Sequence, residues 1–129
     1  MQLSEKEIEI MSAKNNKERY FYFVKKVVDS EAVWVLDDEG FALSGGDNDE
    51  DILMLWPARE YAENCIIDDW KKYKAKELSL NYVMGELLPD LLVKGIKIGV
   101  FMVPSISNTP VVNAEDLLLD LENENSKYN

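Results

Sequence analysis

Helical periodicity dominates residues 4–28. Ser4 followed by Glu7 is a capping-box pattern and predicts a helix that starts near Ser4. A second helix is predicted over residues 16–28, because apolar side chains recur there at intervals of three and four residues while lysines lie off that stripe. The stripe consists of Tyr20, Phe23, Val24 and Val27.

Strand patterns follow in the middle of the chain. Residues 32–36 are rich in β-forming residues, and Asp37 to Gly40 is a turn that leads to residues 41–43, so these two segments are predicted to form a hairpin. The alternation of lysine with apolar residues after Trp70 is typical of a partly exposed strand. The further strands are predicted over residues 52–56, 73–78, 96–103 and 110–112.

Capping and helix-breaking residues place the other helices, which are predicted over residues 58–66, 80–92 and 114–122. Pro57 suits the first position of a helix, and Ser79 and Asn113 are good N-caps for the helices that follow them. Pro89 predicts a kink or a break inside the second of these helices. Gly95 marks its end.

The predicted order of elements is ααβββαβαβ(β)α. Such mixed alternation with a hairpin in front is typical of an α+β (mixed α/β) domain, in which helices pack on one mixed central sheet. At 129 residues the chain is long enough to bury a core without metal or disulfides. We therefore expect a single domain over residues 1–129, with its core over residues 16–122 and a frayed tail at residues 123–129.

Composition restricts the function of such a domain. Asp and Glu number 25 against 14 Lys and Arg, so the formal net charge is -11. That balance argues against nucleic acid and anionic lipid as partners and favours a basic protein. The sequence has no histidine, the usual general base and metal ligand, and its single cysteine supplies neither a disulfide nor a Cys-rich zinc site. No metal or cofactor is expected.

The acid excess is uneven, since residues 1–64 carry 15 acids and 7 bases, and residues 65–129 carry 10 acids and 7 bases. The chain starts without the pattern of a signal peptide, and its longest apolar runs are far shorter than the ~20 residues that span a bilayer. We expect a cytoplasmic protein that does not bind membranes, with Cys65 as a reduced thiol. With no histidine to activate it, Cys65 is interpreted as a buried small hydrophobe.

Three stretches resemble a known family. They are residues 19–36 (RYFYFVKKVVDSEAVWVL), residues 55–63 (LWPAREYAE) with Trp70 behind them, and the pattern Leu88-Pro89 … Gly95 to Phe101 … Val111-Val112. Over residues 17–122 the chain resembles the bacterial family catalogued as domain of unknown function 2750, and the LWP-x-R-E-Y-A segment is the most specific part. A fainter likeness, of architecture alone, is to the N-terminal domain of SseB-like proteins. The resemblance implies a fold and brings no activity or catalytic residues.

The tryptophans suggest one candidate site. Trp34, Trp56 and Trp70 are all predicted at strand positions or edges, and Trp56 stands just before the helix that Pro57 starts. Arg59 is one of only two arginines. A tryptophan, an arginine and the free N–H groups of a helix N-terminus could together hold an anion or a peptide carboxylate. The alternative is that Trp56 belongs to the core and that Arg59 pairs with a neighbouring acid.

Acidic residues suggest a second site. Asp37 and Asp38 lie in the predicted turn, and Asp47 and Asp49 follow in a glycine-containing loop. Asp47, Asp49 and Asp51 stand at alternate positions, as at the start of a calcium loop. Ile52 stands where that motif requires glycine and Ala58 where it requires a bidentate glutamate, so a solvated loop is the better interpretation, with weak cation binding as the alternative. This acidic surface is where we expect a basic partner to bind. The lysines of residues 71–76 are interpreted as protection of an edge strand, with binding of single-stranded nucleic acid as the alternative.

Three functional hypotheses follow. The first is a non-catalytic binding or interaction protein that neutralises a basic protein partner, as an immunity protein neutralises a toxin. The second is a small-ligand- or anion-binding protein, or an enzyme, that uses a pocket bounded by Trp56, Arg59 and Trp70. The third is a homo-oligomeric structural protein assembled through an exposed strand.

Overall fold

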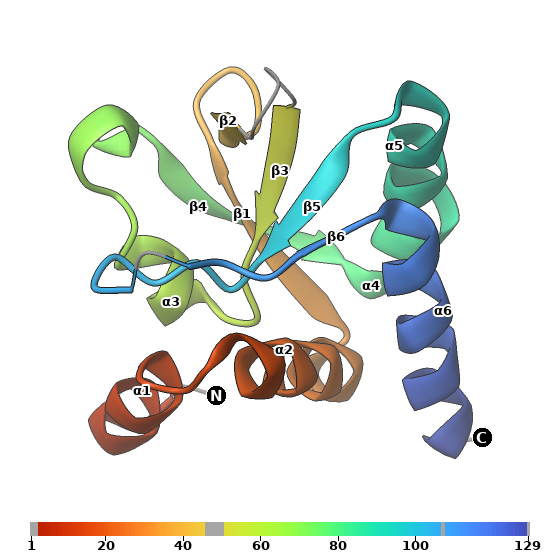
Figure 1. Ribbon diagram of the computed structural model, residues 1–129, viewed down its shortest axis with the longest axis horizontal. Helices are drawn as coiled ribbons and strands as arrows, with labels where there is room; N and C mark the ends of the chain where they lie inside the picture. The colour runs from red at the N-terminus through yellow and green to blue at the C-terminus, as the bar shows by residue number, and fades with distance from the viewer. Residues whose placement is uncertain (1–2, 46–50, 107, 129) are drawn as a thin grey trace.

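The computed structural model describes residues 3–45, 51–106 and 108–128, and over these residues the fold is α+β, with the elements in the predicted order (Figure 1). The helices are α1 (Glu5–Ser12), α2 (Asn16–Ser30), α3 (Arg59–Glu63), α4 (Leu80–Tyr82), α5 (Leu88–Lys94) and α6 (Ala114–Asn125). The strands are β1 (Ala32–Asp37), β2 (Leu43–Gly45), β3 (Asp51–Leu55), β4 (Lys74–Ser79), β5 (Lys97–Val100) and β6 (Val111–Val112).

The strands form two sheets, so the expectation of one central sheet is wrong. β1 and β4 pair antiparallel over their whole length, and β2, β3, β5 and β6 lie in that order in a second sheet, where β3 and β5 are parallel. The sheets meet where Trp34 and Trp56 exchange backbone hydrogen bonds of 3.0 and 2.8 Å. Further along, Ala42 lies between β1 and β3. Its N–H donates to the carbonyl of Leu36 in β1, and its carbonyl accepts from the N–H of Met54 in β3.

The predicted hairpin over residues 32–43 forms only at its turn. A bridge joins Asp37 to Phe41, and the Asp38 N–H donates to the Gly40 carbonyl at 3.0 Å. After the turn the chain leaves β1, and β2 pairs with β3 instead. The long partner of β1 is β4, which the sequence correctly predicts as a partly exposed strand.

Helix α2 buries the predicted stripe against the rest of the protein. Phe23, Val24 and Val27 are buried, and the Tyr20 side chain is half-buried, with its hydroxyl donating to Asp120 on α6. Figure 1 shows α2 and α6 on the outside of the sheets. The same stripe also buries Arg19, a charged residue that the pattern did not assign to the core.

The helical segment between β4 and β5 changes its geometry near Pro89, as predicted. The Ser79 hydroxyl caps α4 by accepting from the Tyr82 N–H at 3.1 Å. A wide π turn then spans Val83–Leu87, and Pro89 lies in the first turn of α5. In a regular α-helix the ring of Pro89 would project into the preceding turn, and the missing N–H of the proline would leave that turn without one hydrogen bond. The π turn takes the place of this regular turn. The segment ends at Gly95, whose φ of 71° is left-handed.

The C-terminal residues, predicted as a frayed tail, are helical as far as Tyr128. Helix α6 continues to Asn125, and a 3₁₀ turn covers Ser126–Tyr128. Glu124 is buried, and its carboxylate accepts from the Lys127 ammonium at 3.0 Å. These local interactions hold the end of the chain in helical form.

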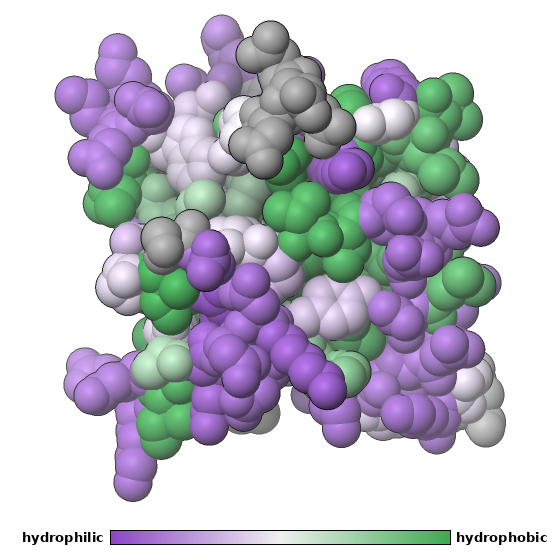
Figure 2. All heavy atoms as spheres, in the orientation of Figure 1, coloured by the Kyte–Doolittle hydropathy of each residue, from purple (hydrophilic) through white to green (hydrophobic). Residues whose placement is uncertain are grey.

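One cluster of apolar side chains joins both sheets and the helices around them. Figure 2 shows the outside of α2 and α6 covered mainly by hydrophilic side chains, which is the polar face expected of helices that bury one stripe. Within the described ranges, no helix combines the length and the apolar character needed to cross a bilayer.

Candidate functional site

Trp56 is a core residue. Its side chain is fully buried, its indole N–H donates to the Met102 carbonyl at 3.0 Å, and its ring meets the Trp70 ring edge-on at a centroid separation of 6.1 Å. Trp70 itself ends a 3₁₀ turn and lines a shallow groove with Cys65 and Ile67. The two rings therefore pack on each other and leave no pocket between them for Arg59.

The helix after Pro57 is shorter than predicted. It spans Arg59–Glu63, and Ala58 precedes it without a side-chain cap. A helix of little more than one turn has only a small macrodipole. Arg59 and Trp70 line different cavities and Trp56 is fully buried, so the structure does not bring these three residues around one pocket. The anion site at the start of this helix stays a prediction.

Arg59 lies against a different tryptophan. Its guanidinium carbon is 4.7 Å from the centre of the Trp34 ring, in a cation–π arrangement. Trp34 is held in β1 by pairing with Glu77 of β4 on one side and with Trp56 on the other. Four of the candidate residues are tryptophan or arginine, namely Trp34, Trp56, Arg59 and Trp70. Of these, the structure brings Trp34 and Arg59 into one site.

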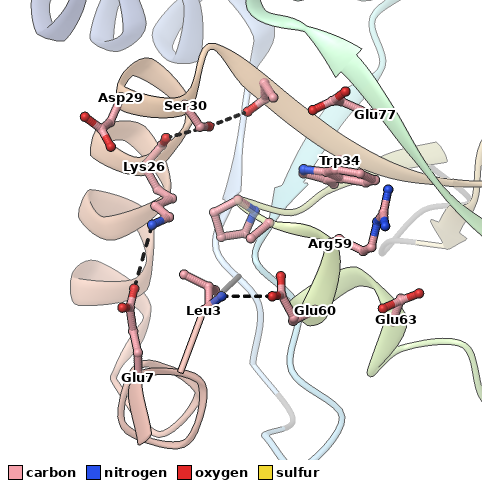
Figure 3. A pocket seen from close by; sticks show the side chains of 13 residues that line it. Leu3, Glu7, Lys26, Asp29, Ser30, Trp34, Arg59, Glu60, Glu63 and Glu77 are labelled. Carbon is pink, nitrogen blue, oxygen red and sulfur yellow. Dashed lines mark hydrogen bonds and ion pairs between the residues drawn. The ribbon is translucent and has the colours of Figure 1, made fainter. Parts of the chain in front are cut away.

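That site is a cavity of about 780 Å³, here named the α2–α3 cavity because the second half of α2 and the start of α3 line opposite sides of it (Figure 3). Leu3, Trp34 and Pro57 give it part of its apolar wall. Five carboxylates and two cations line it, namely Glu7, Asp29, Glu60, Glu63, Glu77, Lys26 and Arg59.

Two of the carboxylates are fixed by hydrogen bonds that close one end of the cavity. Glu60 accepts from the Leu3 N–H at 3.0 Å (Figure 3). Glu7 accepts from the Tyr22 hydroxyl at 2.6 Å, and the Lys26 ammonium lies 3.9 Å from it. These bonds tie α1 and the residues before it to α2 and α3.

The other three carboxylates of the cavity are free of such bonds. Asp29, Glu63 and Glu77 form no hydrogen bond or ion pair with another residue in the described ranges, and all three are exposed. Arg59, also exposed, makes its cation–π contact with Trp34 and no ion pair within the same ranges. The cavity therefore presents unpaired negative charge beside an aromatic face.

The acidic turn is less isolated than the sequence suggests. Asp37 lies opposite Lys74 in the β1–β4 register, so its side chain and the lysine share one face of the sheet. The Lys76 ammonium lies 5.9 Å from the centre of the Phe41 ring, which is part of the same turn. Asp38 is exposed. Asp47 and Asp49 lie outside the described residues.

Cys65 is buried, as predicted. Its thiol lies 3.4 Å from the Met102 carbonyl, the same oxygen that accepts from Trp56. Burial raises the pKa of the Cys65 thiol to about 11, which leaves almost no thiolate at neutral pH. In the part of the chain that the structure describes, no group of three or more Cys, Asp or Glu side chains is placed to hold a metal ion.

Arg19 is the polar residue that sequence reasoning missed. Its side chain is fully buried, and its Nη2 donates to the Asn16 side chain and to the Asn108 carbonyl, both at 2.6 Å. Its Nε and Nη1 have no partner among the described residues, and burial lowers the pKa of the guanidinium. The sequence contains one signal for the burial of Arg19. This residue lies four positions before Phe23, which places it on the apolar stripe of α2.

Comparison with known proteins now gives the chain its family. None of the curated proteins compared with the chain matches it. A family model matches residues 20–121, a span that includes Lys26, Trp34, Arg59 and Glu77 of the α2–α3 cavity and leaves out α1. The match confirms the resemblance seen in the sequence, and the chain belongs to the family described as "Protein of unknown function (DUF2750)".

Proposed function

We propose that the protein is a non-catalytic binding protein for a basic protein partner, and that the α2–α3 cavity accepts a cationic side chain of that partner. The observation that carries this proposal is the lining of the cavity, which includes five acidic and two basic residues, and three of the acidic side chains are unpaired within the described ranges. An incoming ammonium or guanidinium gains these partners, and the apolar wall excludes water from part of the contact.

The charge of the whole chain supports the same class of partner. A net charge of -11 attracts a basic protein over a distance of about one Debye length, which is ~10 Å at ordinary salt, and speeds the encounter. Complementary charge chiefly raises the association rate and selects the partner. A binding protein of this kind would neutralise a basic toxin by occupying it, without any chemical step.

The acidic turn is a second contact region in this proposal. Asp37 and Asp38 would meet basic residues at the edge of the same partner, together with Asp47 and Asp49 of the following loop. Replacing all four by Asn tests this region. Unchanged capture of the partner by that variant would exclude the acidic turn from the interface.

A peptide titration tests the cavity. The probe is a synthetic peptide of alternating Arg and Gly with a fluorescent label, and the readout is anisotropy. Glu63→Gln with Glu77→Gln should weaken binding about twofold to thirtyfold, since the two exposed charges contribute about 0.2–1 kcal/mol each. The matched control is Glu86→Gln with Glu122→Gln, which removes the same charge from exposed positions outside the cavity.

The two variants distinguish binding in the α2–α3 cavity from a general response to the net charge of the protein. Weakening in the cavity variant alone supports the proposal, and weaker binding at higher salt is expected with it. Equal weakening in both variants would show that the peptide responds to net charge alone, and failure of the wild type to bind at low salt would contradict the proposal outright. Assembly into a homo-oligomer remains a separate prediction, which light scattering tests.

A further inference from the structure

The Trp34 face of the α2–α3 cavity already carries a guanidinium. Arg59 places its guanidinium carbon 4.7 Å from the centre of the Trp34 ring, and Figure 3 shows the indole between the side chains of Arg59 and Glu77. Although Glu60 and Glu63 line the same cavity, Arg59 forms no ion pair with them. Stacking on the indole is therefore the interaction that locates this guanidinium.

Trp34 is well suited to hold such a group, because its position is fixed by the backbone. β1 pairs with β4 along its length, and Trp34 also exchanges two backbone hydrogen bonds with Trp56, a fully buried residue. A backbone held in this way leaves only the side-chain torsions of Trp34 to be ordered when it binds a ligand. A planar and weakly hydrated guanidinium stacks on an aromatic face better than a compact, strongly hydrated ammonium does.

The position of Arg59 on α3 allows it to leave that face. It is exposed, and it lies four residues before Glu63, a spacing at which side chains on a helix are neighbours. An arginine that moved off Trp34 would therefore have the Glu63 carboxylate within reach. A second guanidinium in the place of Arg59 would lie on the side of the indole that faces Glu60, whose carboxylate points into the cavity (Figure 3).

We infer that the cationic group which the cavity accepts is the guanidinium of a partner's arginine, and that it takes the place of Arg59 on Trp34. Arg59 then acts as an internal competitor that occupies the face in the free protein. This inference rests on the proposed function and adds two properties to it. The cavity prefers arginine to lysine, and loss of Arg59 strengthens binding.

The test follows the indole N–H signal of Trp34 in a nuclear magnetic resonance titration with two probes, L-arginine methyl ester and L-lysine methyl ester. The signal is identified by its loss in a Trp34→Phe variant. Arg59→Gln should bind the arginine ester about threefold to tenfold more tightly than the wild type, the range expected for one cation–π contact. Its gain for the lysine ester should be smaller.

Lys26→Gln is the matched control, because it removes one positive charge from the opposite side of the same cavity without touching Trp34. This control should change the affinities for both esters by the same small factor. Two results would overturn the inference, because charge alone would then explain the change. In the first, Arg59→Gln raises the affinity for the arginine ester no more than Lys26→Gln does, and in the second it raises the affinities for both esters equally. The peptide titration of the variant that combines Glu63→Gln and Glu77→Gln tests the proposed function independently of that result.

Discussion

Raising the pH above 10 should destabilise the protein through Tyr61, a buried residue of α3. Its side chain is 2 % exposed, its ring packs on Phe101 at a centroid separation of 4.5 Å, and its hydroxyl lies 3.0 Å from that of Tyr22. Burial raises the pKa of Tyr61 to about 12 from its ordinary 10.0, with a further rise from Glu7 and Glu60 and an opposite effect of the hydrogen bond to Tyr22.

The direction of the effect follows from proton binding. Between pH 10 and pH 12 the unfolded chain has lost the Tyr61 proton and the folded protein has kept it, so the free energy of unfolding falls as the pH rises. One titrating group contributes about 1.4 kcal/mol per pH unit, which amounts to about 3 kcal/mol over the full shift. Below pH 10 the contribution is constant. Burial also raises the pKa of Tyr22 and of Tyr20, which makes the total decline steeper.

Urea denaturation between pH 8 and about pH 11.5 measures this decline. Tyr61→Phe keeps the ring and removes the titrating group, so its free energy of unfolding should fall less steeply than that of the wild type, by about 1.4 kcal/mol per pH unit. At pH 8 the variant should lose about 1 kcal/mol with its hydrogen bond. Tyr128→Phe, at a position 63 % exposed, is the control. Equal slopes for Tyr61→Phe and the wild type would refute the reasoning.

Two further predictions concern the core. Cys65 should react with a thiol reagent at pH 8 only after urea unfolds the protein, since burial raises its pKa to about 11, and rapid labelling of the native protein would contradict its burial. Gly99→Ala should lower the free energy of unfolding by about 1 kcal/mol, because a Cβ there would lie 2.7 Å from the Sδ and Cε atoms of Met54, and the flexible end of that buried side chain would have to shift. Gly45→Ala, where no atom of the described residues lies within 4 Å of the added carbon, should change stability far less, and equal losses would contradict the clash.

The features of the fold that sequence predicts well are local. Ser4 and Asn113 both cap helices as expected, each accepting a backbone N–H from three residues further on. Gly95 ends its helix with a left-handed φ, which few other residues adopt without strain. Each of these outcomes depends on residues within one turn of the chain, so the pattern in the sequence contains the whole interaction.

The features that sequence does not predict depend on distant residues. Separation into two sheets follows from the position of Ala42 between Leu36 and Met54, which no local pattern reveals. The burial of Arg19 depends on the Asn108 carbonyl, 89 positions away. Trp56 and Arg59 are three residues apart and point to different surroundings, because one follows a buried strand and the other begins a short helix.

The distribution of charge shows why the candidate site could not be located from the sequence. The acids that stand out in the sequence are the groups at residues 37–39 and 47–51, yet Asp37 of the first group lies opposite Lys74 of β4. The carboxylates of the α2–α3 cavity come from α1, α2, α3 and β4, and in the sequence they are surrounded by unrelated residues. A run of acids spreads its charge into solvent, whereas separated acids that the fold brings around one cavity act on one ligand. The net charge of -11 is thus the basis on which a basic partner is proposed, and the fold determines where the charge of such a partner would be bound.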